Sequence, residues 1–596
     1  MPCAVVICAG LAAISTPLDE RRIALLEMAD EFHVVEGPSE ELPEPNLLLE
    51  VSPDERAEME KALTIFALQD LGMAGAERTD EANRILRASL ASVQVSEAGH
   101  MRGQYARAWN HRVRSLAVRL YALYADRLDE DVRAEFERRM GFMVAPPQTR
   151  SSENIRLTCN SAYLLSHELL GRGDEPTYAQ VRGWLLDFMR ARGQDGWHEW
   201  GSSYSVWSLG AVQNLAELSR DAEVRELALM LVDYTLAQMA GFCLDGSFCS
   251  GAVRRYRHWT NGYFEPQSII ASTLFGGEVR PSWFCFVEWA VSGYAPLLSV
   301  ARLYHTPRPF EARLSTGGHP WRYRARVTDG YAISTMQVLD TRYLALPSGG
   351  THDIVGCFVQ SGADPAEHVV PYGHQMEGGP RKRRNASERY FGYDNVAFAN
   401  QGGRVHAIWA SGGVDDVAIR LFHTPAFRAT IEGGWAFLSD GTTYVAWAPT
   451  VGDPILDPES GTWNDPETLG AWLRSTHVPG PEGETAVIEV GSAVEFGSYE
   501  AFREDLTSRN PRPRVDGEGW VSYTARDGSE LEFGPAGARV DGASVSLEGW
   551  PRAEMPGLAD YELTVPEGTV RFDFAAGEMS GDLGRMEHEI VFGEAR

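Results

Sequence analysis

The first half of the chain carries the hydrophobic spacing of amphipathic helices. Between about residues 20 and 305, apolar residues recur every three to four positions with polar residues opposite them, which predicts α-helices with one buried face. Clusters of Gly, Pro and Asp separate these segments. Helical hairpins in series stack as a solenoid or close into an α/α toroid, and the lack of a fixed-period repeat motif favours the toroid. The predicted helices are 54–71, 79–93, 103–127, 129–142, 154–170, 178–192, 204–220, 222–239 and 284–304.

The pattern changes across residues 307–319. From Trp321 onward, short β-rich runs are separated by turn residues, and two sheets packed face to face would bury their alternation. We therefore predict a multidomain α+β protein, with an N-terminal α/α toroid (an incomplete barrel of helical hairpins) over 20–306 and an antiparallel β-sandwich over 307–480. A Pro- and Gly-rich stretch at 478–484 predicts a separate β-rich domain over 481–596. The predicted strands are 331–339, 353–360, 405–410, 417–423, 443–448, 486–490, 520–526, 530–534, 543–547 and 569–574.

The composition restricts the kinds of molecule that the protein can bind. The formal net charge of −29 makes nucleic acid and anionic membranes poor partners, and no stretch reaches the ~18–20 apolar residues of a membrane span. The seven cysteines show neither metal-like spacing nor a disulfide framework. Residues 1–19 include an apolar run of signal-peptide length that lacks a preceding Lys or Arg. We interpret them as a signal or disordered segment and expect an extracellular or periplasmic location, with the cytoplasm as the alternative.

One turn concentrates aromatic and titratable groups. Trp197, His198, Glu199, Trp200 and Tyr204 fall within eight positions at the start of a predicted helix. Titratable groups beside aromatic rings form binding sites for sugars. The alternative is a capped helix start in which the two tryptophans fill the core.

A basic segment stands out in the acidic chain. Arg254-Arg-Tyr-Arg-His258 holds four basic or potentially basic groups in five residues, which indicates an anionic ligand. Its cations favour the ionised form of the Tyr256 phenol. The alternative is a solvated loop whose arginines pair with nearby Asp and Glu.

These segments occur in a recognisable order. Ser152-Glu-Asn-Ile-Arg156 with Asn160-Ser-Ala-Tyr163, then the turn at 197–204, then 254–258, resembles the motif order of heparinase II/III-like polysaccharide lyases. Tyr331-Ala-Ile-Ser-Thr-Met-Gln337 followed by Gly349-Gly-Thr-His352 is similar to a strand and loop of the same group. The resemblance covers roughly residues 100–450 and implies the toroid and sandwich architecture.

The same resemblance implies cleavage of a uronate-containing polysaccharide or oligosaccharide by β-elimination. That reaction needs a group that neutralises the substrate carboxylate, a base for the C5 proton and an acid for the leaving O4. In this chain, the resemblance assigns neutralisation of the substrate carboxylate to Asn160 and Arg255. It assigns proton transfer to Tyr256, with assistance from His198. No cofactor is expected, although the chemistry leaves room for a divalent cation. The expected substrate-binding residues are Asn154, Trp197, Glu199, Trp200, Tyr204, Arg254, His258, Trp259, Tyr263 and His352.

Two features complicate these assignments. Asn154 and Asn160 are six residues apart, which is not a same-face helical spacing, so Asn154 is the second choice for the carboxylate clamp, or a helix cap together with Glu153. Asp245-Gly-Ser-Phe248 is similar to a turn of hyaluronate and chondroitin lyases, but Gly251 and Thr260 stand where those families place His and Tyr. That departure argues against this subgroup.

Two other function classes stay open. An α/α-toroid glycoside hydrolase would use Glu199 as the acid and Asp195 or Glu153 as a second carboxylate. A non-catalytic glycan-binding protein would stack Trp197, Trp200 and Trp259 on sugars. No G-x-S-x-G, Walker A or H-E-x-x-H pattern occurs, so α/β-hydrolase, P-loop and zincin functions have no support.

Overall fold

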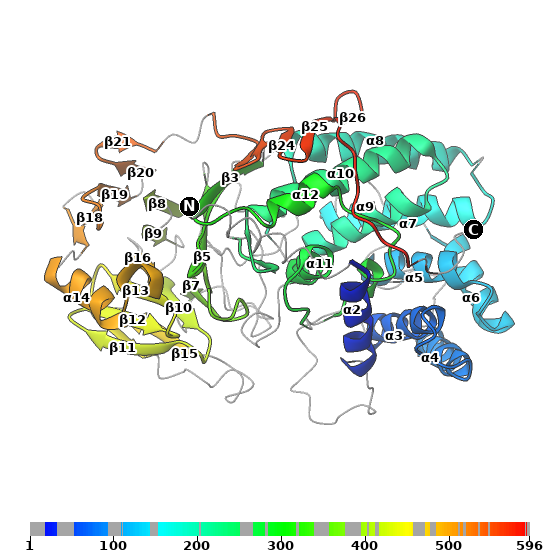
Figure 1. Ribbon diagram of the computed structural model, residues 1–596, viewed down its shortest axis with the longest axis horizontal. Coiled ribbons are helices and arrows are strands. Elements are labelled where there is room, and N and C mark those ends of the chain that lie inside the picture. The colour runs from blue at the N-terminus through cyan, green and yellow to red at the C-terminus, as the bar shows by residue number, and fades with distance from the viewer. Residues whose placement is uncertain are drawn as a thin grey trace, which may run out of the picture.

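The structure of the 596-residue chain is a computed structural model. It describes residues 18–32, 53–92, 109, 111–143, 153–173, 175–198, 200–201, 204–250, 266–280, 284–316, 321–338, 357–375, 395–401, 405–411, 417–456, 471–476, 484–509, 513–516, 520–534, 537–545, 549–590 and 592. The helices gather at one end of the molecule and the sheets at the other (Figure 1). The predicted fold class, an α/α toroid followed by an antiparallel β-sandwich, is confirmed.

The helices form an inner and an outer layer. The inner helices α3, α5, α7 and α9 pack side by side in that order, whereas α4, α6, α8 and α10 pack on their outer side. The helices are α2 (Leu18–Phe32), α3 (Pro53–Asp70), α4 (Arg78–Ser92), α5 (His111–Tyr124), α6 (Glu130–Gly141), α7 (Glu153–Leu169), α8 (Pro176–Asp195), α9 (Ser205–Leu218), α10 (Ala222–Ala240), α11 (Pro266–Phe275), the 3₁₀ turn η2 (Val287–Trp289) and α12 (Leu298–Leu303).

Helix α2 connects the two ends of the inner layer. It packs against α3 on one side and α11 on the other, and α11 in turn contacts α9. Arg21 donates from Nη2 to the Leu274 carbonyl at 2.8 Å, so a cation meets the carbonyl end of α11, where the helix dipole favours it. Among the described residues, neither α2 nor α11 belongs to a helical hairpin, so the toroid is an incomplete barrel of hairpins.

Two helical regions differ from the sequence prediction. Segment 284–304 was predicted as one helix, but only η2 and α12 form there. Phe286 adopts the left-handed conformation, with φ 50°, which a bulky side chain rarely adopts and which cannot continue a helix. Helix α11 was not predicted because all ten of its residues are buried, so it has no polar face and no amphipathic period.

The strands form a two-sheet sandwich and a smaller third sheet. The first sheet has the order β14-β15-β10-β7-β6-β5-β4-β3-β22-β23-β24-β25-β26, and the second has the order β11-β12-β13-β16-β9-β8. β5 packs on β8, and β10 packs on β9 and β16, so the two sheets face each other. Strand β4 shows the alternation of a strand with one buried face, because Trp321, Tyr323, Ala325 and Val327 are buried while the arginines between them are only partly buried.

The strand bounds, in chain order, are β3 (Phe310–Thr316), β4 (Trp321–Val327), β5 (Tyr331–Val338), β6 (Cys357–Ser361), β7 (His368–Gln375), β8 (Asn395–Gln401), β9 (Val405–Ser411), β10 (Val417–His423), β11 (Arg428–Glu432), β12 (Trp435–Ser439), β13 (Thr443–Pro449), β14 (Pro454–Leu456), β15 (Ala471–Ser475) and β16 (Glu484–Ser492). The third sheet holds β17 (Arg514–Val515), β18 (Val521–Thr524), β19 (Glu530–Gly534), β20 (Gly537–Val540) and β21 (Ala543–Ser544). Helices α13 (Ala493–Phe496) and α14 (Tyr499–Arg509) lie between β16 and this sheet in the chain.

The predicted division at residues 480 and 481 does not coincide with a sheet boundary. β16 pairs with β13 and β9 inside the second sheet, and the last five strands extend the first sheet from β3. The pairing of β22 with β3 joins residues more than 200 positions apart, such as Leu314 and Ala553, which local sequence patterns do not reveal. The five strands are β22 (Ala553–Met555), β23 (Leu558–Ala559), β24 (Glu562–Val565), β25 (Gly568–Asp573) and β26 (Glu578–Gly581).

The C-terminal strands and the segment after them fasten the sandwich to the toroid. β24 packs on α12 and β26 on α10, and the red end of the ribbon continues across the helices (Figure 1). Arg585 donates to the buried carboxylate of Asp233 at 2.7 Å, and the Tyr294 hydroxyl donates to the same carboxylate at 2.6 Å. The C-terminal segment therefore helps to stabilise the helical domain that the first half of the chain forms.

Candidate active site

The turn between α8 and α9 carries the predicted sugar-binding motif. Gly196 ends α8 with φ 83°, a left-handed conformation that suits glycine, and its amide donates to the Arg192 carbonyl at 2.8 Å. Trp197, His198, Trp200 and Tyr204 are described, whereas Glu199 lies outside the described residues. His198 is half-buried, and the other three are buried.

A buried carboxylate holds this turn against the first turn of α7. Glu153 accepts a hydrogen bond at Oε1 from Arg192 Nη1 at 3.0 Å and at Oε2 from the His198 backbone amide at 3.1 Å. Arg192 Nη1 also donates to the Gly196 carbonyl at 2.9 Å. Both carboxylate oxygens are therefore engaged, and the contact fixes the backbone at His198. The role of Glu153 here is structural, and sequence reasoning did not foresee its partner Arg192.

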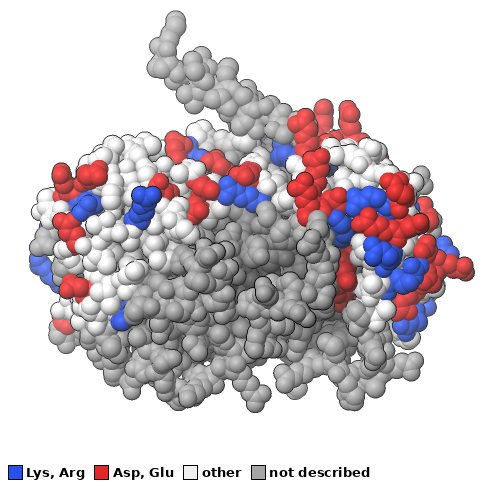
Figure 2. Space-filling view, turned by 90° about the horizontal axis from the view of Figure 1, so that it is seen from below, with Lys and Arg blue, Asp and Glu red and all other residues white. Residues whose placement is uncertain are grey.

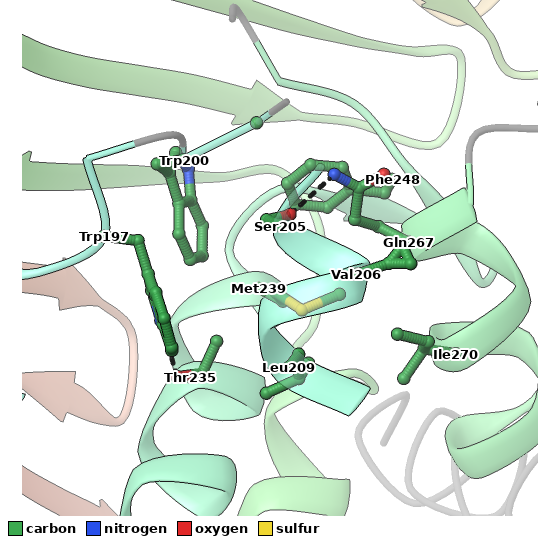
Figure 3. A pocket seen from close by; sticks show the side chains of 11 residues that line it. Trp197, Trp200, Ser205, Val206, Leu209, Thr235, Met239, Phe248, Gln267 and Ile270 are labelled. Atoms are coloured by element: carbon green, nitrogen blue, oxygen red, sulfur yellow. Dashed lines mark hydrogen bonds between the residues drawn. The ribbon is translucent and has the colours of Figure 1, made fainter. Parts of the chain in front are cut away.

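Both tryptophans of the turn fill the core. Each is only 2% exposed; Trp197 Nε1 donates to Thr235 Oγ1 at 2.9 Å, and Trp200 packs edge-on against Phe242 and Phe248 with ring centroids 5.9 and 6.0 Å away. Figure 3 shows the two rings side by side above α9 and α10. This burial supports the interpretation of a helix start with tryptophans as core residues, since neither ring presents an open face to a ligand.

The cavity beneath the turn is too small for a sugar. Its volume is about 10 Å³, roughly the space that one water molecule needs. Its lining nevertheless shows which segments converge, because Trp200 lines it together with Phe248 of β2 (Ser247–Phe248) and Gln267 of α11 (Figure 3). Phe248 and Gln267 lie within three residues of the two described ends, Ser250 and Pro266, that flank the undescribed segment with Arg254, Arg255, Tyr256, His258, Trp259 and Tyr263. Phe248 and Gln267 therefore both lie against the turn that carries Trp200.

The hairpin before the basic segment is docked on the sandwich. It joins β1 (Cys243–Leu244) to β2, and at Gly246, with φ 79°, a side chain would collide with the Gly276 carbonyl at 2.3 Å. Gln360 of β6 donates to the Pro365 carbonyl at 2.6 Å and also to the hydroxyl of Ser247. The β1–β2 hairpin therefore lies at the junction between toroid and sandwich.

Tyr323 reaches the turn from the other side of that junction. From β4, its hydroxyl donates to the Trp200 carbonyl at 3.2 Å. Burial raises the pKa of Tyr323 well above its ordinary value, so this phenol stays protonated and serves as a hydrogen-bond donor. Local sequence patterns do not indicate this contact, because the partners lie 123 residues apart.

The two asparagines of α7 lie at different heights along the helix. Asn154 and Asn160 are both buried, and Asn160 Nδ2 donates to the Arg156 carbonyl at 2.8 Å. The contact between Glu153 and His198 brings the start of α7, with Asn154, to the turn, whereas Asn160 lies six residues farther, or about 9 Å at 1.5 Å per residue. The structure thus brings Asn154 closer to the turn along the helix than Asn160.

The remaining predicted site residues fall on undescribed segments. Glu199, Arg254, Arg255, Tyr256, His258, Trp259, Tyr263 and His352 lie outside the described residues, so their roles stay predictions. Of the carboxylates weighed for hydrolysis, Glu153 is engaged as above, and Asp195 is exposed at the end of α8.

Surface charge, candidate metal ligands and the apolar character of the helices add three observations. In the view of Figure 2, basic side chains on the described surface are interspersed with acidic ones, as in the pairing of Arg182 with Asp221 and Glu223 at 2.5 and 2.7 Å. Within the described ranges, no group of three or more His, Cys, Asp or Glu is placed to hold a metal ion. None of the described helices combines the length and apolar character of a membrane-crossing segment.

Comparison with known proteins gives only distant structural matches. No protein-family model and no curated protein matches the chain. A Streptomyces coelicolor A3 chondroitin AC lyase solved with chondroitin sulphate is 13% identical, with 94% of this chain and 88% of that chain covered and a TM-score of 0.45. A chondroitinase AC lyase studied with oligosaccharides is 10% identical (97% and 98% covered, TM-score 0.41). A heparan sulfate lyase HepC mutant from Pedobacter heparinus is 9% identical (88% and 90% covered, TM-score 0.32).

Proposed function

We propose that the protein is a polysaccharide lyase that cleaves an anionic, uronate-containing glycan by β-elimination. The observation that carries the proposal is the convergence beneath one turn of three segments: the His198 turn itself and the two described flanks of the basic segment, Phe248 and Gln267. Two of the motifs that resemble those of the heparinase II/III-like lyases, the start of α7 and the His198 turn, are also in contact through Glu153 and the His198 amide.

The proposed reaction assigns one role to each residue. Asn160 and Arg255 neutralise the uronate carboxylate, which stabilises the negative charge that develops when the C5 proton leaves. Tyr256, as the base, takes this proton. The C4–O4 bond then breaks with its electron pair going to O4, a proton is returned to O4, and His198 assists these transfers. The products are a 4,5-unsaturated uronate and a glycan end with a free hydroxyl.

The structure makes a comparison of the two asparagines informative. Asn154 lies beside the turn, and Asn160 lies farther along α7, so Asn160→Ala and Asn154→Ala separate the first and second choices for the clamp. Loss of the clamp should lower kcat together with kcat/KM, because it acts most strongly as charge grows in the transition state. If Asn154→Ala loses more kcat and kcat/KM than Asn160→Ala does, the clamp role moves to Asn154.

The test of the reaction is its product. Incubation with a panel of uronate polymers should yield the ultraviolet absorbance of a 4,5-unsaturated uronate. Reducing ends without that absorbance would establish hydrolysis through Glu199 instead, and binding without either signal would establish a glycan-binding protein. An extracellular or periplasmic location goes with this proposal, because such polymers occur outside the cytoplasm.

A further inference from the structure

Two arginines and a serine stand in a row across three neighbouring strands of the first sheet. Ser315 of β3 pairs with Arg322 of β4, and its amide donates to the Arg552 carbonyl at 3.2 Å just before β22. Residues that pair across strands project from the same face, with strands ~4.8 Å apart. The two arginines are thus about 10 Å apart along the row, and the short serine leaves room between their long side chains.

Arg552 is buried with unused hydrogen-bond donors. It is 8% exposed, and its Nη2 packs so closely on Gly196 that a side-chain carbon there would lie 2.1 Å away. Its Nε and Nη1 have no hydrogen-bond partner among the described residues. Buried donors without partners destabilise a protein, so this guanidinium has two N–H groups left over for an acceptor.

The charged groups around Arg552 are of both signs, and the Asp560 carboxylate accepts a hydrogen bond from its backbone amide at 2.7 Å. Arg192 and Asp195 are its charged neighbours on α8, and Arg192 is already paired with Glu153. Burial, and after it the nearby Arg552, lower the pKa of Arg322. Arg322 is half-buried, so the row reaches solvent at that end.

We infer that Arg322 and Arg552, with Ser315 between them, form an oxyanion-binding subsite for a carboxylate or sulfate group of an anionic glycan. The identity of the glycan rests on the proposed function. Gly196 lies two residues before His198, so the subsite would hold an acidic group on a sugar next to the one at the His198 turn. An anion there would satisfy the donors of Arg552 and relieve the repulsion between the arginines.

A purely structural role for Arg552 makes different predictions. In that interpretation, Arg552 serves the carbonyl end of α8 and balances Asp195, and Arg322 is a surface residue of β4. The protein would then bind no oxyanion at this place, and a change at Arg322 would not alter anion binding.

Calorimetric titration with sodium sulfate, against sodium chloride at equal ionic strength, separates the two interpretations. We expect saturable sulfate binding that weakens at least ~10-fold in Arg322→Gln, the scale for a lost charge-assisted hydrogen bond. Arg324→Gln is the matched control, because Arg324 lies two residues along the same face and pairs with Glu311 at 2.6 Å; it should bind sulfate as the wild type does. Arg552→Gln, checked for native circular dichroism, should weaken binding in the same way.

Several results would overturn the inference. It fails if the wild type binds sulfate no better than chloride, or if Arg322→Gln binds sulfate unchanged. Titration with an unsulfated uronate oligosaccharide and with a sulfated one shows whether the subsite takes a carboxylate or a sulfate. Sulfate binding that depends on Arg322 without lyase activity on any glycan would refute the proposed function and keep the subsite. If Arg322→Gln keeps lyase activity with unchanged KM and unchanged sulfate binding, the subsite is refuted and the proposed function is kept.

Discussion

Replacing Glu153 by Gln tests how the His198 turn is held. The substitution keeps the volume and one carbonyl oxygen but removes the charge that balances Arg192, whose side chain is 9% exposed beside a carboxylate that is 3% exposed. Breaking a buried ion pair costs about 3–5 kcal/mol when one charge is left alone. Arg192 keeps its bond to the Gly196 carbonyl, so we expect the unfolding free energy to fall by the lower part of that range, about 3 kcal/mol.

Urea unfolding followed by tryptophan fluorescence measures this loss, since Trp197 lies in the same turn. The matched control is Glu223→Gln, which removes a carboxylate that pairs with two arginines but is half-exposed on the outer layer. Exposed pairs contribute less than about 1 kcal/mol. In the folded variant, kcat/KM should fall because the backbone at His198 is released. Unfolding of Glu153→Gln at the same urea concentration as the wild type would refute this account of the turn.

Three further predictions concern other parts of the molecule. Arg585→Met leaves the Asp233 carboxylate buried and should lower the unfolding free energy by ~3 kcal/mol or more in thermal unfolding; an unchanged midpoint would show that the C-terminal contact does not stabilise the toroid. Burial raises the pKa of Glu55 from 4.5 to about 7, so the native state binds more protons than the unfolded one between these pH values, and stability falls as pH rises through them. Glu55→Gln should therefore add up to ~3 kcal/mol at pH 8 and almost nothing near pH 4.5, and equal effects at both pH values would contradict the assignment. Tyr256→Phe should fold normally and lose ~10²-fold or more in turnover by ultraviolet absorbance, whereas near-normal turnover with loss in Tyr204→Phe would move the role to Tyr204.

Long helices were predictable from their apolar spacing, and the short helix α11, of ten residues, was not. Segment 222–239 was predicted from its period and occurs as α10, from Ala222 to Ala240, with Asp221 accepting a hydrogen bond from the Val224 amide at its start. α11 has the same helical backbone but is buried on every side, so its sequence shows no period. Phe286 and the residues after it depend on tertiary contacts: Glu60 accepts a hydrogen bond from the Phe286 amide at 3.1 Å, which helps to hold a backbone that the local sequence does not favour.

The candidate site likewise has features that the sequence showed and features that it did not. The concentration of His and aromatic residues at the turn was visible in the sequence. The same tryptophans suit a sugar platform and a core, and only their burial distinguishes the two. The contacts that shape the turn come from Glu153 and Tyr323, which lie far from it in the chain and carry no local signal.

Tyr323 also shows what the Tyr256 hypothesis requires. Both tyrosines have an arginine on each side in the sequence, but β4 is extended, so Arg322 and Arg324 project from the opposite face to Tyr323. The pKa of Tyr323 is accordingly raised by burial alone, and the adjacent arginines do not favour its phenolate. Adjacent cations therefore act on a phenol only where the backbone turns and brings them to its side. The proposed role of Tyr256 as a base thus depends on a bent conformation at 255–257, or on cations from elsewhere at the junction, and an extended backbone there would remove its main electrostatic support.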